Sequence, residues 1–425
     1  MKIDFETKII TDGVSLNVVK DPKFNTNIAS VRFISSFTGE DASARAFVPN
    51  ILTAHCRKYP TRALLNRKLL SLYNATLSGS TSVVGDNYVT TITVRCINDK
   101  HAYDGEDVTA EAVKLLLECI FNPDCENGRF DDKEFEIIKQ DLLDTIDSEI
   151  NNKRGYAAML ANEIIFEGEP SSVWFYGTKE TAMALTNEQV YDCYVDTLKN
   201  AEIKLMVGGN GIDEAAQLLS DAFASFPRPK KEEIKYYVPS PCKKEVRFVE
   251  KHSDVSQTRL SLAYKGGSGN VYVDKLFCAM FGGTPTSRLF MNVREKLQLC
   301  YSCSSYLKEY KSTMLVDAGI DKANCDKAID EINRQLSYLS DGDFTDEELY
   351  QTKLMITGAF RSNYDSISSL CIWYDVQQSR GTCYTPDEVI DIFMGITRED
   401  VIRCAKSYKL DTVFMLTPDS QPKGN

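Results

Sequence analysis

Short runs of apolar residues followed by helix-patterned segments recur along this chain. "NIASVRFISSF" at 27–37 and "QTRLSLAYKGG" at 257–267 both have the apolar or alternating pattern of a β-strand. Sequence with helical periodicity follows each run. Because single regular helices do not separate the strands one by one, the pattern favours helices packed on a mostly antiparallel sheet.

Two helical segments of the first half have counterparts in the second half. "FDDKEFEIIKQDLLDTI" begins at Phe130 and parallels "FTDEELYQTKLMITGAF", which begins at Phe344, 214 positions later. A second capped helix followed by an apolar strand begins at Leu185, and its counterpart begins at Ile396, 211 positions later. Each helix starts with capping and acidic residues, as helix N-termini do. The repeats therefore predict a tandem duplication.

The duplication predicts an α+β fold of two homologous α/β-sandwich domains, each with a mostly antiparallel sheet and helices on one face. The predicted domains cover residues 1–228 and 246–425. We expect a linker at 229–245, because the surrounding stretch "FPRPKKEEIKYYVPSPCKKE" is rich in Pro and Lys. The alternative is one large α/β domain, but the chain contains no Gly-rich nucleotide-binding motif.

The composition is that of an ordinary globular protein, with 43% hydrophobic and 26% charged residues in a chain of 425. A net charge of −12 argues against binding to nucleic acid. No run approaches the roughly 18 apolar residues of a membrane span, and the N-terminal "MKIDFETKII" has no apolar leader. We therefore expect a cytoplasmic protein whose 13 cysteines are reduced and largely buried.

Cys300 and Cys303 have the spacing of a C-x-x-C motif. A metal site of this kind needs a second pair or suitably spaced histidines, and none follows. A thioredoxin-like site needs the motif at the start of a helix, whereas here it closes one. If "CYSCSS" forms a strand, residues three apart face opposite sides. The motif is therefore interpreted as two unrelated thiols.

The segment "FGGTPTSRLFMNVREKLQLCYSCSS", 281–305, resembles the second-domain signature of insulinase/pitrilysin-type (inverzincin) metallopeptidases. Residues 20–37 and 395–416 fit the same family, so the resemblance spans nearly the whole chain. It is closest to the short two-domain, processing-peptidase-like group. Within that group it resembles a non-catalytic subset associated with aminopentanol modification of elongation factor P. The resemblance implies a LuxS/processing-peptidase-like sandwich fold and dimers whose four domains enclose a chamber.

Active members of this family hold zinc through an H-x-x-E-H helix and a distal Glu. In this chain the corresponding helix is expected at 44–62, and the resemblance places Ala46, Pro49 and Asn50 where His, Glu and His would stand. Asp144 falls near the position of the distal Glu. A catalytic zinc needs three protein ligands, so we expect these positions to be degenerate and no metal to bind here. The chain has three histidines, and we interpret His55 as structural.

The resemblance also concerns "VREKLQLCY", in which Arg294 and Tyr301 are spaced like the Arg and Tyr that active members supply from the second domain. An Arg fork can hold a carbonyl or carboxylate, and a Tyr hydroxyl can hydrogen-bond an oxyanion. We therefore predict that Arg294 and Tyr301 bind substrate. In active members an edge strand of the first domain can bind an extended peptide. The resemblance implies the same role for the corresponding strand near 73–80 in this chain.

These expectations combine into a catalytically inactive peptidase homologue. We expect it to be the non-zinc subunit of a heterodimeric zinc peptidase, with peptide as substrate and with zinc on a homologous partner chain. A homodimer is the other possible assembly. Two alternatives stay open: an active zinc-dependent metalloendopeptidase in which His55 or His252 meets Asp144, and a purely structural or peptide-binding subunit.

Overall fold

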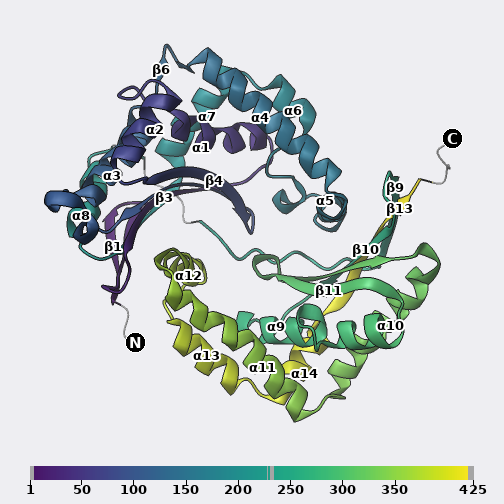
Figure 1. Cartoon of the computed structure of the whole chain (residues 1–425). Coiled ribbons are helices and arrows are strands. Elements are labelled where there is room, and N and C mark those ends of the chain that lie inside the picture. Colours follow the sequence, from purple (N-terminus) through teal and green to yellow (C-terminus); the bar gives the residue numbers. More distant parts are fainter. Residues whose placement is uncertain (1–3, 227, 230–233, 420–425) are drawn as a thin grey trace. The chain divides into compact units, whose positions relative to one another are not determined.

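The chain forms two compact units, and each is assembled from separate stretches of sequence. The computed structural model describes residues 4–226, 228–229 and 234–419 (Figure 1). The first unit comprises residues 1–148, 174–236 and 363–383, and the second comprises 149–173, 237–362 and 384–425. The predicted domains differ from these units at 149–173 and 363–383, which group with the opposite half of the sequence. Residues 230–233 of the predicted linker lie outside the described residues.

The first unit is built on a six-stranded sheet. Its strands, in spatial order, are β1 (Asp4–Thr11), β2 (Val14–Lys20), β8 (Glu202–Gly209), β3 (Thr26–Ser36), β5 (Asn87–Ile97) and β4 (Thr76–Val84). The β2–β8 pair is parallel and every other pair in this sheet is antiparallel. β4 ends the order, so β5 is its only partner among the described strands.

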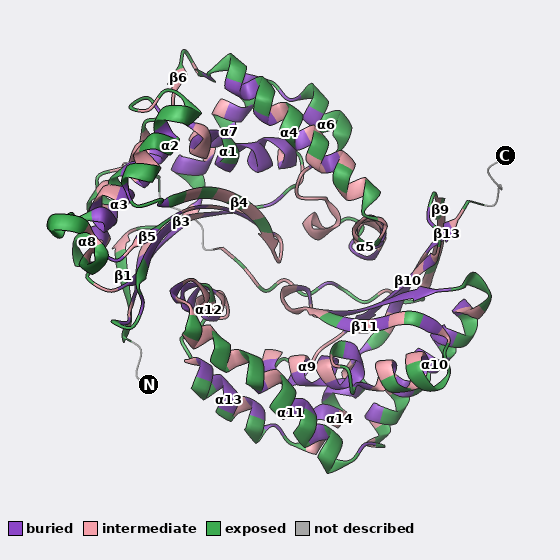
Figure 2. Ribbon diagram, in the orientation of Figure 1, coloured by how far each residue is buried: buried purple, intermediate pink, exposed green. Residues whose placement is uncertain are grey.

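Helices with buried residues on their inner sides form a layer on one face of this sheet (Figure 2). They are α1 (Ala42–Ala54), α2 (Arg62–Ser71), α3 (Val108–Phe121), α4 (Asp132–Asn151), α6 (Lys179–Ala184), α7 (Asn187–Asn200) and α8 (Asp213–Ala224). A two-stranded hairpin of β6 (Cys125–Glu126) and β7 (Arg129–Phe130) precedes α4. No helix in the described part of the chain is both long and apolar enough to cross a membrane.

The opposite face of the first sheet is covered by α12 (Ile367–Ser379), which comes from the second half of the sequence. Leu370 and Tyr374 of α12 pack against Met206 of β8 in a buried apolar cluster. Asp375 pairs with Arg32 of β3 at 2.8 Å. Alternate residues of a strand face opposite sides, so these strand residues lie on the face away from α1 and α7.

Among its described residues, the second unit repeats this sheet without a counterpart of β1. Its strands, in spatial order, are β9 (Arg247–Ser253), β13 (Lys409–Pro418), β10 (Thr258–Lys265), β12 (Thr313–Ile320) and β11 (Cys300–Lys308). The β9–β13 pair is parallel and the other pairs are antiparallel, as in the first sheet. The identical order and strand directions confirm the duplication and the α+β class.

The second unit also combines its sheet with helices, one of which comes from the other half of the sequence. They are α5 (Lys153–Ile165), α9 (Val271–Cys278), α10 (Cys325–Asp341), α11 (Asp346–Arg361), α13 (Pro386–Gly395) and α14 (Arg398–Ser407), with π-helical turns η4 (Ala279–Gly283) and η5 (Leu289–Lys296). α5, from the first half of the sequence, packs Ala161 and Ile165 against Ala263 of β10 and Phe414 of β13. It is the counterpart of α12.

The duplicated helices also share a tertiary contact. Lys139 of α4 donates to the carbonyl of Leu185 at 2.8 Å, and Lys353 of α11 donates to the carbonyl of Ile396 at 2.6 Å. Both acceptors immediately precede the Thr that caps the next repeated helix, α7 or α14, in a capping box. The same lysine therefore secures the same helix start in both units.

Candidate functional site

Arg294 and Tyr301 line one cavity of the second unit. Arg294 lies near the end of η5, and Tyr301 is the second residue of β11. The cavity has a volume of about 340 Å³. Its lining residues are Arg294, Glu295, Gln298, Leu299, Cys300, Tyr301, Asp321 and Asn324. The structure thus brings together the two residues that the sequence analysis singled out, and their role in binding stays a prediction.

The Arg294 side chain is held by its own turn of helix. Its guanidinium carbon lies 4.6 Å from the centroid of the Phe290 ring, a cation–π contact, and Nη1 lies 3.6 Å from a carboxylate oxygen of Glu295. The side chain is 40% exposed. These contacts orient the guanidinium along the cavity wall and leave a large part of it open to solvent.

Tyr301 projects from the sheet because β11 has a bulge at this residue. Cys300 pairs with Ile320 and Ser302 pairs with Gly319, so Tyr301 has no opposite residue on β12. A bulged residue is released from the ladder and re-aimed. The Tyr301 side chain is 65% exposed, and its hydroxyl lies 3.4 Å from Asp321 Oδ2. At that distance the hydrogen bond is weak, and the hydroxyl can turn to another acceptor or donor.

A residue in the left-handed conformation lies between the two predicted substrate-binding residues, Arg294 and Tyr301. Gln298 has φ +51°, a region that costs a non-glycine residue about 1–2 kcal/mol. The reversal there allows Leu299 N–H to bond back to the carbonyl of Val293 at 3.0 Å. Strained residues of this kind concentrate at functional sites. Here the turn brings the end of η5 back toward the start of β11.

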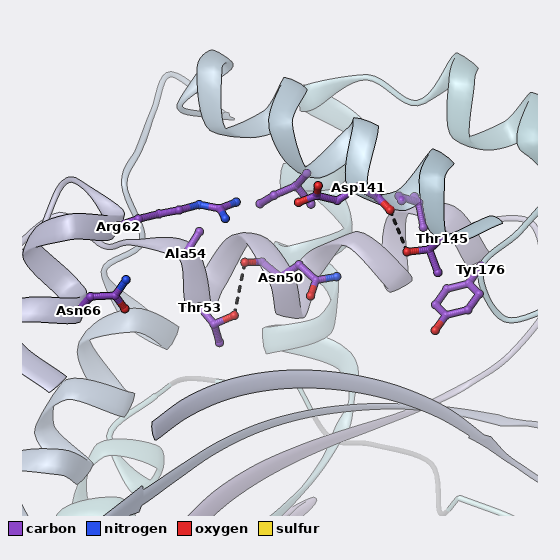
Figure 3. A pocket seen from close by; sticks show the side chains of 10 residues that line it. Asn50, Thr53, Ala54, Arg62, Asn66, Asp141, Thr145 and Tyr176 are labelled. Atoms are coloured by element: carbon purple, nitrogen blue, oxygen red, sulfur yellow. Dashed lines mark hydrogen bonds between the residues drawn. The ribbon is translucent and has the colours of Figure 1, made fainter. Parts of the chain in front are cut away.

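A second cavity lies in the first unit, between α1 and α4 (Figure 3). Its volume is about 450 Å³. The lining residues are Asn50, Thr53, Ala54, Arg62, Asn66, Ile138, Asp141, Leu142, Thr145 and Tyr176. Residues of α1 and α4, the two helices that carry the predicted degenerate ligand positions, both line this cavity.

The positions predicted to replace zinc ligands lie on α1 and α4. Ala46 and Pro49 are buried in α1, and Asn50 donates its amide to the Ala46 carbonyl at 3.1 Å. Asp144 lies outside the cavity lining and accepts a hydrogen bond from Gln140. α4 instead directs Asp141 and Thr145 into the cavity (Figure 3).

Comparison with known proteins agrees with this architecture. A family model described as "Peptidase M16 inactive domain" matches residues 184–356. The chain is 24% identical over 419 residues to "Probable inactive metalloprotease YmfF" of Bacillus subtilis, with 97% of each chain covered. Among solved structures, a conserved protein from Enterococcus faecalis has a TM-score of 0.90 at 25% identity over 99% of this chain and 100% of its own. A peptidase M16 inactive domain from Pseudomonas fluorescens has a TM-score of 0.78 at 16% identity over 100% of both chains.

This chain is an M16-family homologue. The M16 family is the insulinase/pitrilysin-type family, so the resemblance predicted from residues 281–305 is confirmed. The match to an inactive-domain model and the similarity to a probable inactive metalloprotease place it with the inactive homologues of the family.

The first-unit cavity of this M16 homologue does not fit the zinc ion of active members. Zinc is held by imidazole, thiolate or carboxylate groups, and a catalytic site uses three of them. Among the described residues that line the cavity only Asp141 has such a side chain, and Asn50 offers an amide. The other two predicted ligand positions, Ala46 and Pro49, are not in the lining and have no side-chain atom that could bind zinc. Across the described residues, no group of three or more His, Cys, Asp or Glu side chains is arranged to hold a metal ion.

His55 takes part in the packing beyond the end of α1. It is buried, and Nε2 lies 3.7 Å from a carboxylate oxygen of Glu134, while Nδ1 lies 3.6 Å from Asp124. Glu134 also accepts a hydrogen bond from Arg62 Nε at 2.6 Å. His55 therefore connects the end of α1 to α4, and it does not line the cavity.

Several lining residues were not identified from the sequence. Asp321 and Asn324 follow β12, and only the pairing of β12 with β11 brings them beside Tyr301. Asp141 and Thr145 could have been found, because Ile138 and Leu142 form an apolar stripe on the same face of α4. That stripe indicates which side of α4 faces α1.

Proposed function

We propose that this M16 homologue is a catalytically silent subunit that binds peptide for a zinc-bearing homologous chain. The observation that carries the proposal is the contrast between two cavities. Arg294 and Tyr301 share one cavity in the second unit, whereas the first-unit positions that would hold zinc carry Ala46, Pro49 and Asn50. The chain thus has groups that can hold a substrate and lacks, at those positions, the ligands for a metal.

The second-unit cavity suits a peptide backbone. The Arg294 guanidinium can donate to a carbonyl or carboxylate oxygen through its planar fork. The Tyr301 hydroxyl, weakly held by Asp321, can donate to a carbonyl oxygen or to the oxyanion formed when that carbonyl is attacked. Asp321 can in turn accept a peptide N–H. Donors and an acceptor close together match the alternating C=O and N–H groups of an extended chain.

The open edge of β4 supports the same substrate class. β4 ends the order of the first sheet, and its residues from Thr76 to Val84 are exposed or half-buried. An extended peptide can add to such an edge through backbone hydrogen bonds without regard to its sequence. Each unit thus offers its own peptide-binding feature.

The proposed partner is a homologous chain with an intact H-x-x-E-H motif, which would carry the zinc and the attacking water. A heterodimer is the preferred assembly, and a homodimer is the other arrangement. We keep the cytoplasm as the expected location. The association with aminopentanol modification of elongation factor P stays a prediction of the sequence resemblance.

The first experiment measures metal content and peptide cleavage of the purified full-length chain. Zinc is quantified by inductively coupled plasma mass spectrometry, and cleavage of fluorogenic peptides is followed with and without EDTA. We expect zinc far below one ion per chain and no EDTA-sensitive cleavage. Stoichiometric zinc together with EDTA-sensitive cleavage by the chain alone would establish the alternative, an active metalloendopeptidase with unusual ligands.

The second experiment mixes the chain with an H-x-x-E-H homologue from the same organism. We expect zinc-dependent cleavage by the mixture to fall at least about tenfold with Arg294→Ala or Tyr301→Phe, because a lost oxyanion donor typically costs that much or more. Arg334→Ala and Tyr306→Phe are matched controls on exposed side chains outside the cavity. If all four variants support equal cleavage, the chain is a scaffold.

A further inference from the structure

The bulge at Tyr301 places Cys300 and Cys303 on the same face of β11. Cys300 pairs with Ile320 and Cys303 pairs with Ala318, so β12 advances by two residues while β11 advances by three. Every second residue of β12 points to the same face of the sheet, and paired residues of neighbouring strands share a face. Two β11 residues whose partners are two apart on β12 therefore lie on the same face. The sequence-based prediction that the two thiols face opposite sides is therefore wrong, because it assumed an unbroken ladder.

The two thiols are unequal. Both residues are buried, and Cys300 lines the Arg294–Tyr301 cavity whereas Cys303 is not part of its lining. A hydrogen bond from Cys303 lowers the pKa of Cys300, and the positive charge of Arg294 contributes in the same direction. The hydrogen bond to Cys300 and burial raise the pKa of Cys303 well above its usual value. Cys300 is thus the more acidic thiol and the one that meets the solvent in the cavity.

We propose that Cys300 and Cys303 form a reversible disulfide that reshapes the Arg294–Tyr301 cavity. Two residues of β12 separate their pairing positions, which corresponds to about 6.8 Å along a strand. That span is at the upper end of the Cα–Cα range that a disulfide tolerates, about 4.4–6.8 Å. Closing the bond draws the ends of the bulge together, and a bond made under such strain is readily reduced again.

The oxidant in this reaction is a disulfide such as oxidised glutathione. The Cys300 thiolate attacks one glutathione sulfur, forms a mixed disulfide and releases one glutathione thiolate. Cys303 then gives up its proton, and its thiolate attacks the Cys300 sulfur and releases the second glutathione thiolate. The protein loses two protons and two electrons, and glutathione disulfide gains them to become two thiols. The low pKa of Cys300 favours its role as the first nucleophile.

The disulfide encloses Tyr301 and Ser302 in a small ring. Tyr301 is the residue that the bulge releases from the ladder, so contraction of the bulge moves its side chain away from the position beside Asp321. Oxidation therefore alters the hydroxyl that the cavity offers to a ligand. This consequence for binding rests on the proposed function, whereas the covalent step does not depend on it.

The test exposes the reduced full-length chain to glutathione buffers of increasing oxidised fraction, followed by trapping with N-ethylmaleimide. Trypsin releases Leu297–Lys308 as one peptide that contains both thiols. After oxidation we expect this peptide to carry no maleimide adduct and to have a mass two hydrogens below that of the unmodified reduced peptide. The second step of Cys300–Cys303 disulfide formation is intramolecular. At constant total glutathione, we therefore expect this pair to be half-oxidised at a ratio of oxidised to reduced glutathione at least about tenfold lower than the ratio that half-converts the exposed Cys242 to its mixed disulfide.

Two variants separate the disulfide from simple thiol modification. Cys303→Ser should retain one glutathione on Cys300 and form no internal bond, and Cys303→Ala should do the same if serine disturbs the buried site. Cys242→Ser should leave oxidation of the 297–308 peptide unchanged. The proposal is overturned if the wild-type peptide retains both adducts until Cys242 is modified, or if Cys300 ends as a stable glutathione adduct. Cleavage assays play no part in this readout, so failure of the proposed function would leave its result intact.

Discussion

Gly79 of β4 lies directly against Pro49 of α1. A Cβ atom on Gly79 would stand 2.4 Å from the Pro49 carbonyl oxygen and 2.7 Å from its carbonyl carbon. Because these atoms belong to the backbone, no side-chain rotation can relieve the overlap. The contact therefore sets how closely α1, which carries the positions of the missing zinc ligands, approaches the open edge strand.

Gly79→Ala should lower the free energy of unfolding by about 1–3 kcal/mol, the usual cost of forcing extra volume into a packed site. Urea denaturation followed by circular dichroism measures it. The larger effect is expected on peptide binding, because α1 must move away from β4 to accommodate the methyl group.

Gly358→Ala is the control for this substitution. Gly358 lies in α11, and an added Cβ has no neighbour within 4 Å. Gly358→Ala should raise the free energy of unfolding by about 0.4–1 kcal/mol, because alanine makes the unfolded chain less flexible than glycine does. Equal responses to the two substitutions would show that the Pro49–Gly79 contact imposes no constraint.

Asp411→Ala should destabilise the protein by about 3–5 kcal/mol, the usual cost of breaking a buried ion pair. Asp411 is fully buried in β13 and accepts hydrogen bonds at 2.7 Å from Lys243 N–H and the Thr412 hydroxyl. The buried Lys265 ammonium lies 3.6 Å away and would lose this counter-charge. Chemical denaturation measures the change. Lys114→Ala, which breaks an exposed pair with Glu111, should leave stability close to unchanged.

The Asp411 contribution should also disappear in acid. Burial acts to raise the pKa of Asp411, but hydrogen bonds from Lys243 and Thr412, together with the positive charges of Lys265 and Lys243, outweigh it and lower the pKa from 3.8. A lowered native pKa means that the stabilisation is present above the unfolded value and is lost as pH falls through the native value. Below about pH 3.8 the wild-type protein should therefore lose stability faster than Asp411→Ala. If the free energies of unfolding of the wild-type protein and Asp411→Ala fell equally with decreasing pH, this assignment would be contradicted.

Stability should fall between pH 9 and pH 11 in part because of Cys96. Burial raises the pKa of this thiol in β5 from 9.0 to about 11. The native state thus holds the proton more tightly than the unfolded chain, so the stabilisation present below pH 9 is lost as pH rises through 11. Two pKa units correspond to about 3 kcal/mol. Cys96→Ala should reduce the alkaline loss in urea titrations, whereas Cys242→Ala, on an exposed thiol, should not.

Gln298→Gly should test whether the turn in the second-unit cavity is strained. Glycine adopts φ +51° freely, so the variant should be up to about 1 kcal/mol more stable than Gln298→Ala, which keeps the strain. Thermal denaturation compares the two. Peptide affinity should fall in the glycine variant, because the path from Arg294 to Tyr301 becomes flexible. A glycine variant no more stable than the alanine variant would show that this conformation costs little.

Sequence patterns predicted the fold class and the duplication because those features are local or periodic. The helix caps at Thr186 and Thr397 and the repeated lysines Lys139 and Lys353 are visible as spacing, and the structure gives them equivalent contacts. The partnership of α12 with the first sheet was not predictable in this way. An amphipathic pattern shows that a helix has a buried face and does not show which sheet covers it.

The site was predictable to a similar extent. Arg294 and Tyr301 were identified through the family resemblance of residues 281–305, while Asp321 and Asn324 depend on strand pairing. The relation between Cys300 and Cys303 depends on one unpaired residue, and a shift of one residue moves a side chain to the other face. Composition and spacing contain no information about such a bulge.

The exchanged helices α5 and α12 bear on how such a chain could arise. Each half of the duplicated sequence supplies a sheet and also the helix that covers the opposite face of the other half's sheet. In a half-length ancestor, that face of the sheet would have been exposed to solvent. Two copies could have covered each other's exposed face by exchanging this helix, as in a domain-swapped dimer. Gene fusion would then have fixed this helix exchange within one polypeptide. Cutting the present chain near 226–245 should accordingly yield two fragments that fold well only together.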